Sequence, residues 1–202
     1  MKYFFITIVI LLSFTQIYAQ QTGTFKDPRD GRVYRTTTYT DVLKGKEVTW
    51  FAENLDYKTS SDSWAYNFDE EYRKNLGLLY TWDAAIQACP NGWHLPSKNE
   101  WDFLVNQYGG WKVAGQDLKS KNGWYENGDG TNISGFNLFP AGGGYNEIGS
   151  DYHTLGYSTR LWESTVIDKG SSYARNFWYK ESAVHRENTN TDYGCSVRCI
   201  KD

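Results

Sequence analysis

The side chains in this sequence best suited to acid–base or metal chemistry are its three histidines, His94, His153 and His185. Histidine acts in catalysis when a nucleophile and an orienting partner lie beside it, and it binds zinc in spacings such as HExxH. None of the three occurs in such a spacing. We therefore expect no catalytic residue and no metal ligand among them, and a structural hydrogen-bonding role for His94.

Two short segments carry oxygen-bearing side chains at close spacing. Residues 127–132 (NGDGTN) resemble a calcium loop in composition but lack the later glutamate of an EF-hand. Consecutive tight turns have the same composition, and we favour them, with calcium binding near Asp129 as the alternative. The acidic run at residues 69–71 is interpreted as a solvated face. We expect no metal and no cofactor.

The three cysteines, Cys89, Cys195 and Cys199, leave one thiol unpaired if two of them form a disulfide. Residues 195–200 have strand character, and residues four apart along a strand are separated by about 13 Å, which is beyond disulfide reach. A bond between Cys195 and Cys199 is therefore disfavoured. Pairing of Cys89 with either of the other two stays open on these grounds.

Aromatic residues make up 17% of the chain, with nine Trp and sixteen Tyr. Most of the Trp are expected to fill the core. The stretch 145–193 differs, because Tyr, Asn and Arg on loops held by a rigid scaffold are typical of binding surfaces. The residues that we predict to bind a ligand are Tyr145, Tyr152, Tyr157, Arg160, Tyr173, Arg175, Trp178 and Tyr179.

Two helices are predicted ahead of this stretch. Ser97 and Glu100 form a capping-box pattern before an apolar face, so a helix should begin directly after Ser97 and end before Gly109. Thr81 is a good N-cap for a second, short helix over residues 82–88. The side of that helix expected to be buried carries Trp82, Ala85 and Ile86.

Strand candidates are rich in β-branched or alternating apolar residues and are bounded by turn residues. The dipeptide Asp30-Gly31 predicts a turn, so residues 24–37 are expected to form a hairpin or a bent strand. The polar residues 58–75 are predicted to be a loop. The further strand candidates are residues 48–51, 135–141, 161–165, 172–179 and 195–200. Without an internal repeat or linker, the pattern predicts a single α+β domain over residues 20–202, with small antiparallel sheets and long loops.

Residues 1–19 have the features of a signal peptide, because Lys2 precedes an apolar core too short for an ordinary membrane span and Ala19 offers a cleavage site. No cysteine is placed there for lipid attachment. The net charge is −3 without a cluster of basic residues, which argues against nucleic acid and anionic membranes as partners. We predict a secreted, periplasmic or cell-surface protein, soluble after cleavage following Ala19, with an uncleaved anchor as the alternative.

The string CPNGWHLPSKNEW at residues 89–101 resembles the signature of the Fibrobacter succinogenes major paralogous domain, a family of secreted bacterial proteins. Other blocks resemble that family in the same order, and together they cover nearly the whole chain after the leader. These blocks are DGRVY (30–34), TWFAENL (49–55), GLLYTW (77–82), the segment 135–142, LWEST (161–165) and SVRC (196–199).

The resemblance implies a C-type-lectin-like fold with two short helices, in the branch that includes formylglycine-generating enzymes. It also implies a disulfide between Cys89 and Cys199, which leaves Cys195 as a buried free thiol. Formylglycine-generating enzymes carry a reactive cysteine pair, and Cys195 and Cys199 resemble such a pair in position. A disulfide between Cys89 and Cys199 would leave Cys199 unable to form it. The strings Glu-Pro-Asn and Gln-Pro-Asp, typical of calcium-dependent lectins, do not occur.

We therefore expect a non-catalytic binding module, and not an enzyme, that recognises a glycan or a cell-surface protein through residues 145–193. A structural subunit of a surface assembly is the first alternative. An oxidase of the formylglycine-generating type is the second, less favoured alternative.

Overall fold

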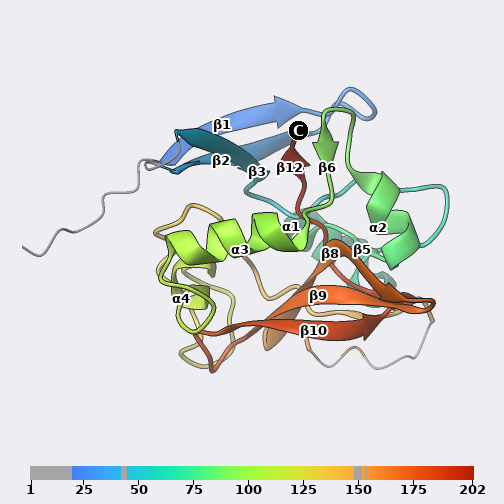
Figure 1. Cartoon of the computed structure of the whole chain (residues 1–202). Helices are drawn as coiled ribbons and strands as arrows, with labels where there is room; N and C mark the ends of the chain where they lie inside the picture. Colours follow the sequence, from blue (N-terminus) through green and yellow to red (C-terminus); the bar gives the residue numbers. More distant parts are fainter. Residues whose placement is uncertain (1–19, 42–44, 148–151, 153) are drawn as a thin grey trace, which may run out of the picture.

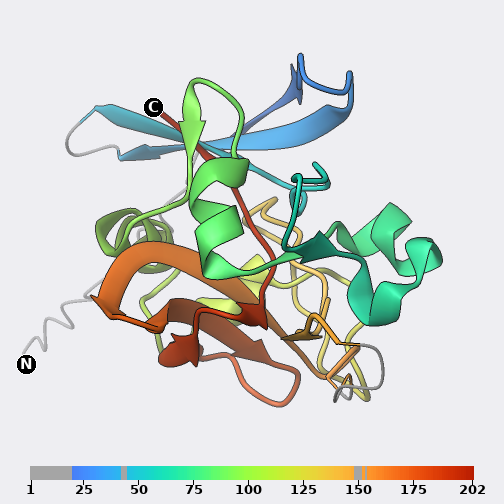
Figure 2. The ribbon, with the colours of Figure 1, turned by 90° about the vertical axis from the view of Figure 1, so that its right-hand side faces the viewer.

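The computed structural model describes residues 20–41, 45–147, 152 and 154–202, so the predicted leader at residues 1–19 lies outside the described residues. The chain forms short helices and small antiparallel sheets, which confirms the predicted α+β class. Figures 1 and 2 show the two larger sheets on opposite sides of the helix α3 (Lys98–Gln107). The likeness to the C-type-lectin-like fold stays a prediction.

The larger sheet joins strands from the two ends of the described chain. Its strand order is β1-β2-β3-β12-β6, so the last strand in sequence lies between two much earlier ones. The predicted hairpin at Asp30-Gly31 is confirmed as the β1–β2 pair, and Gly31 adopts a positive φ of 79° in its turn. The strands are β1 (Gln20–Lys26), β2 (Val33–Asp41), β3 (Lys46–Phe51), β6 (Trp93–His94) and β12 (Ile200–Lys201).

The second sheet has the order β10-β9-β8 and consists of β8 (Ser158–Asp168), β9 (Ser171–Trp178) and β10 (Val184–Asn190). It confirms the strands predicted at residues 161–165 and 172–179, whereas β10 was not predicted. Two smaller sheets pair β4 (Ser63–Trp64) with β5 (Leu79–Tyr80) and β7 (Gly144–Tyr145) with β11 (Tyr193–Gly194).

The capping box at the start of α3 forms as predicted. The Ser97 amide donates to the Glu100 carboxylate at 2.8 Å, which fixes the first turn. Trp101, Leu104 and Val105 are buried along one face and pack with side chains from both larger sheets. The helix thus forms a layer between the two sheets and packs against both.

The second predicted helix is α2 (Trp82–Ala88), where the Thr81 hydroxyl accepts a hydrogen bond from the Ala84 amide. Its predicted buried face is confirmed at Ala85 and Trp82 and wrong at Ile86. Ile86 is 39% exposed, and the small side chains of Ala85 and Ala88 lie against the core instead. Alanine allows the helix to approach the core closely, which leaves Ile86 at the side.

The loop predicted at residues 58–75 is wrong from Ser63 onward. It contains β4, a 3₁₀ turn η1 (Tyr66–Phe68) and most of a helix, α1 (Glu70–Leu76). The Asp69 side chain accepts from the Glu71 amide at 2.9 Å, and acidic residues in the first turn favour the helix dipole. With α4 (Gly115–Leu118), the described residues contain four α-helices where two were predicted.

The predicted strand at residues 135–141 is also wrong. Phe136 and Leu138 are buried as the alternation required, but Asn137 has a φ of +52° that interrupts extended pairing. Only isolated bridges form near this segment. Residues 195–200 likewise make isolated bridges before β12 begins at Ile200.

A disulfide joins Cys89, directly after α2, to Cys199, directly before β12, with 5.8 Å between their Cα atoms. This confirms the pairing that the family resemblance implied. Cys195 is a buried free thiol, also as expected. The chain after β11 is therefore tied covalently to the region between the first and third helices.

Candidate functional site

The eight residues predicted to bind a ligand do not form one surface. The structure distributes them over three groups: Tyr157, Trp178 and Tyr179 near one end of the β8–β9 pair, Tyr145, Tyr152 and Arg160 near β7 and β11, and Tyr173 and Arg175 on β9 facing α3. Strand alternation causes much of this separation, because successive side chains on β9 point to opposite faces of its sheet.

Tyr157 and Tyr179 of the first group form the clearest aromatic surface together with Tyr125, and we call these three residues the tyrosine patch. Their ring centroids are 4.4 Å apart for Tyr125 and Tyr157, 5.3 Å for Tyr157 and Tyr179, and 5.7 Å for Tyr125 and Tyr179. Tyr125 is 46% exposed. Three exposed or half-exposed rings in mutual contact give a large, rigid surface at low entropic cost.

Backbone hydrogen bonds fix the rings of the tyrosine patch. The Tyr179 amide donates to the Tyr157 carbonyl at 2.8 Å, which continues the pairing of β8 with β9. The Tyr125 amide donates to the Gly156 carbonyl, also at 2.8 Å. The loop around residue 125 is thereby attached to the residue preceding Tyr157, so the three rings are positioned before any ligand arrives.

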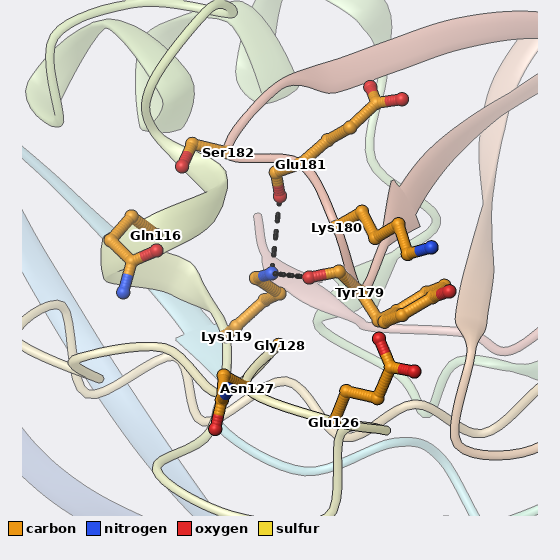
Figure 3. A pocket seen from close by; sticks show the side chains of 9 residues that line it. All are labelled: Gln116, Lys119, Glu126, Asn127, Gly128, Tyr179, Lys180, Glu181 and Ser182. Atoms are coloured by element: carbon orange, nitrogen blue, oxygen red, sulfur yellow. Dashed lines mark hydrogen bonds between the residues drawn. The ribbon is translucent and has the colours of Figure 1, made fainter.

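A hollow of about 220 Å³ lies beside the tyrosine patch (Figure 3). Lys119 lies at its base, and its Nζ donates to the carbonyls of Trp178, Tyr179 and Glu181 at 3.1–3.3 Å. Burial lowers the pKa of Lys119 to about 8, and the charges of Asp129 and Glu181 partly offset that effect. Lys119 therefore holds the segment after β9 in place and closes the base of the hollow.

Polar groups surround the rings. Figure 3 shows Lys180 and Glu126 on opposite sides of the Tyr179 ring, and the Lys180 Nζ lies 5.1 Å from that ring's centroid. Hydrogen bonding to Tyr179 and the charge of Glu126 raise the pKa of Lys180. Hydrogen bonding to Tyr125 raises the pKa of Tyr157, so its hydroxyl is neutral at physiological pH. The patch thus combines apolar faces with donors and acceptors.

Sequence reasoning missed Tyr125, Glu126 and Lys119. They lie upstream of the stretch 145–193 and reach the site only through the folding of the glycine-rich loops after α4. The dipeptide Trp124-Tyr125 gave only a weak indication that Tyr125 belongs to a surface site. In the structure Trp124 is buried, whereas Tyr125 is exposed. Among the turn residues predicted there, the Asp129 carboxylate accepts from the Trp124 amide at 3.0 Å, as a turn residue does.

The second group packs partly inward. The Trp64 indole donates to the Tyr152 hydroxyl at 2.8 Å, and Tyr66 packs edge-on against the Tyr152 ring. Tyr145 contacts the Tyr193 ring edge-on at 5.1 Å, and the Arg160 guanidinium lies 5.2 Å from the same ring. This group mainly attaches β7 and β11 to the second sheet.

The third group is an ion-pair cluster. Arg175 is buried, with its Nε 3.0 Å from Glu163 and its Nη2 3.0 Å from Asp102. Arg186 pairs with the other oxygen of Glu163 at 2.7 Å and lies over the Tyr173 ring. Burial alone would raise the pKa of Glu163, but the hydrogen bond from Arg186 and the arginine charges lower it, so the carboxylate stays ionised.

The three cysteines are divided between one disulfide and one buried thiol. Burial raises the pKa of the Cys195 thiol strongly, which opposes thiolate formation. Cys199 is bonded to Cys89, so it does not form a reactive pair with Cys195. Across residues 20–41, 45–147, 152 and 154–202, no three His, Cys, Asp or Glu side chains are grouped to hold a metal ion.

These features define an α+β protein with a disulfide-tied C-terminal strand and an aromatic surface patch. The chain belongs to the Fibrobacter succinogenes major domain family, whose model matches residues 34–201. No curated protein and no solved structure matches the chain. Among the helices of the described residues, none has both the length and the apolar character needed to cross a membrane.

Proposed function

We propose that this protein is an exported, non-catalytic module that binds a glycan through the tyrosine patch. The observation that carries the proposal is the contact of three tyrosine rings beside a hollow bordered by Lys180 and Glu126. A sugar ring offers C–H groups on its faces and hydroxyls on its rim. Aromatic faces carry partial negative charge that attracts the polarised C–H groups, and the charged side chains pair with the hydroxyls.

The amides beside the patch suit the same ligand. Gln116 and Asn127 line the hollow, and each offers both a donor and an acceptor. Rings and amides together match a ligand that is apolar on its faces and polar at its edges. A purely apolar ligand would make no use of the charged groups of Lys180 and Glu126 at the rim of the hollow.

Export is part of the proposal. The leader predicted at residues 1–19 and the disulfide between Cys89 and Cys199 support it, because structural disulfides persist mainly in oxidising compartments. All described strands lie at or after Gln20. Removal of the leader would therefore leave every described strand intact.

The test is retention of the protein on an array of bacterial and plant glycans, followed by substitution of the patch. Tyr125→Ala and Tyr157→Ala should each weaken binding about tenfold, which corresponds to roughly 1.4 kcal/mol for a lost ring contact. Tyr179 is not substituted, because its ring also packs against the core. A calcium chelator should leave the binding unchanged.

Tyr72→Ala is the matched control, because Tyr72 is also an exposed tyrosine but lies on α1, outside the patch. It should retain wild-type binding. If the patch variants bind as tightly as the wild type while circular dichroism shows them folded, the patch is not the binding surface. If the protein binds no glycan on the array, the alternative role as a structural subunit of a surface assembly is favoured.

A further inference from the structure

A second groove lies on the other side of the segment that follows β9. It runs between α3 and the strands β9 and β10 and has a volume of about 450 Å³. The buried side chains of Val105 and Val184 give it an apolar floor, and Trp111 stands at its edge with 57% of its surface exposed. A tryptophan so exposed beside a groove offers a flat apolar face to a ligand.

Cationic side chains are gathered in this groove. Arg175 and Arg186 are cross-strand partners on β9 and β10, and Lys98 lies at the start of α3. The carboxylates within the cluster are Asp102 and Glu163. Glu181, whose carboxylate lies 2.6 Å from the ring of His185 at the groove, is a third carboxylate, so three cations face three carboxylates here. On a chain whose net charge is −3, the groove is distinguished by its gathered cationic N–H donors, which suit an anionic ligand.

The two arginines have donors to spare. Glu163 accepts hydrogen bonds from Nε of Arg175 and from Nε and Nη2 of Arg186. Asp102 accepts a hydrogen bond from Nη2 of Arg175. Nη1 of Arg175 makes no hydrogen bond to any described residue, and Arg186 is hydrogen-bonded to Tyr173 in addition to Glu163. Each guanidinium has five N–H donors, so a ligand carboxylate can bind a remaining donor without breaking the pairs to Glu163.

From this arrangement we propose that the groove binds an acidic sugar, with its carboxylate at Arg186 and Lys98 and its ring against Trp111. The planar guanidinium matches a carboxylate, and the indole face matches the C–H face of a pyranose. The site is separate from the tyrosine patch. The segment from Tyr179 to Arg186 borders both, with Glu181 at the first hollow and His185 at the second.

Calorimetric titration of the protein with trigalacturonate and with its methyl ester tests the proposal, because the two probes share rings and differ in charge. We expect the acid to bind at least about tenfold more tightly than the ester, and to lose affinity between 50 and 300 mM NaCl by screening. Equal affinities for acid and ester, or no binding of the acid, would overturn the proposal.

Substitutions locate the site. Lys98→Gln and Trp111→Ala should each weaken trigalacturonate binding several-fold, and both side chains are exposed enough for the variants to fold. Lys46→Gln removes a lysine charge from β3, away from the groove, and should bind like the wild type. Loss of acid binding in Tyr125→Ala but not in Trp111→Ala would refute the groove and support the tyrosine patch.

Discussion

At the scale of single residues, several charged side chains are enclosed by the protein and join distant parts of the chain. Arg198 donates from Nε to Asn54 at 2.7 Å and from Nη1 to the Phe136 carbonyl at 2.7 Å. Burial lowers its pKa to about 9, so the guanidinium is still charged at neutral pH, and these acceptors satisfy its buried N–H groups. Glu163 plays the equivalent anionic role between β9 and β10. Such groups stabilise the fold only while their partners remain.

Glu163→Gln should lower the free energy of unfolding by about 3 to 5 kcal/mol, because it leaves two arginines sharing one buried, uncharged amide. Urea unfolding at pH 7 measures the effect. Glu47→Gln, on the exposed part of β3, is the control and should change stability by less than about 0.5 kcal/mol. A loss of similar size in both variants would show that the arginine pairing is not the cause.

At the scale of elements, the side chain of His94 links its own strand β6 to the helix α3 and to the residue after β12. His94, in β6, lies 2.9 Å from the Glu100 carboxylate of α3 and 2.6 Å from Asp202, which follows β12. This places His94 in the structural role expected for it. Burial lowers the pKa of His94, but the hydrogen bonds to Asp202 and Glu100 outweigh burial and raise it above 6.5. Only the doubly protonated ring donates to both carboxylates.

Stability should therefore fall as the pH rises from about 6 to 8. A raised pKa in the folded state means that the stabilisation is fully present below the unfolded pKa near 6.5 and is lost above the folded pKa. The ring is 41% exposed, so screening limits the effect to below about 1 kcal/mol. Urea titrations across this range measure it, and His94→Gln should remove the slope. An unchanged slope in that variant would assign it to another group.

The elements that sequence predicted well are those with local signals. Ser97 with Glu100, Thr81 and Asp30-Gly31 each specify a cap or turn within a few residues, and all three formed. Local periodicity could not reveal β10, whose polar sequence VHRENTN is a strand only because β9 pairs with it. The positive φ of Asn137 likewise depends on the surrounding fold, since Asn132 accepts from its amide.

The candidate site was predicted only in part, because the positions of several of its residues depend on contacts with distant parts of the chain. Tyr157 and Tyr179 were identified as ligand-binding candidates, and pairing of their backbones brings them together. Composition could not show that Tyr152 and Arg175 would pack into the molecule, because each depends on partners far away in sequence, Trp64 and Asp102. Nor could it show that Tyr125 would join the patch.

At the scale of the whole molecule, the disulfide between Cys89 and Cys199 closes a loop of 110 residues. Cross-linking a loop of this length removes unfolded-state entropy worth about 4 to 5 kcal/mol. The double variant Cys89→Ser/Cys199→Ser should lose about that much unfolding free energy in urea. A loss below about 1 kcal/mol would contradict the entropic account. The native protein should also leave Cys195 unreactive toward a thiol reagent until it unfolds, because that thiol is buried.

The placement of β12 has a consequence for biosynthesis. This last strand lies between β3 and β6, and the Phe51 amide donates to the Cys199 carbonyl at 2.9 Å. The chain leaves the ribosome N-terminus first, so β3 and β6 emerge long before β12, the strand that pairs with both. The larger sheet cannot be completed, and the disulfide cannot close, until β12 and Cys199 have been synthesised. A precursor exported as proposed would therefore carry an incomplete larger sheet until that point.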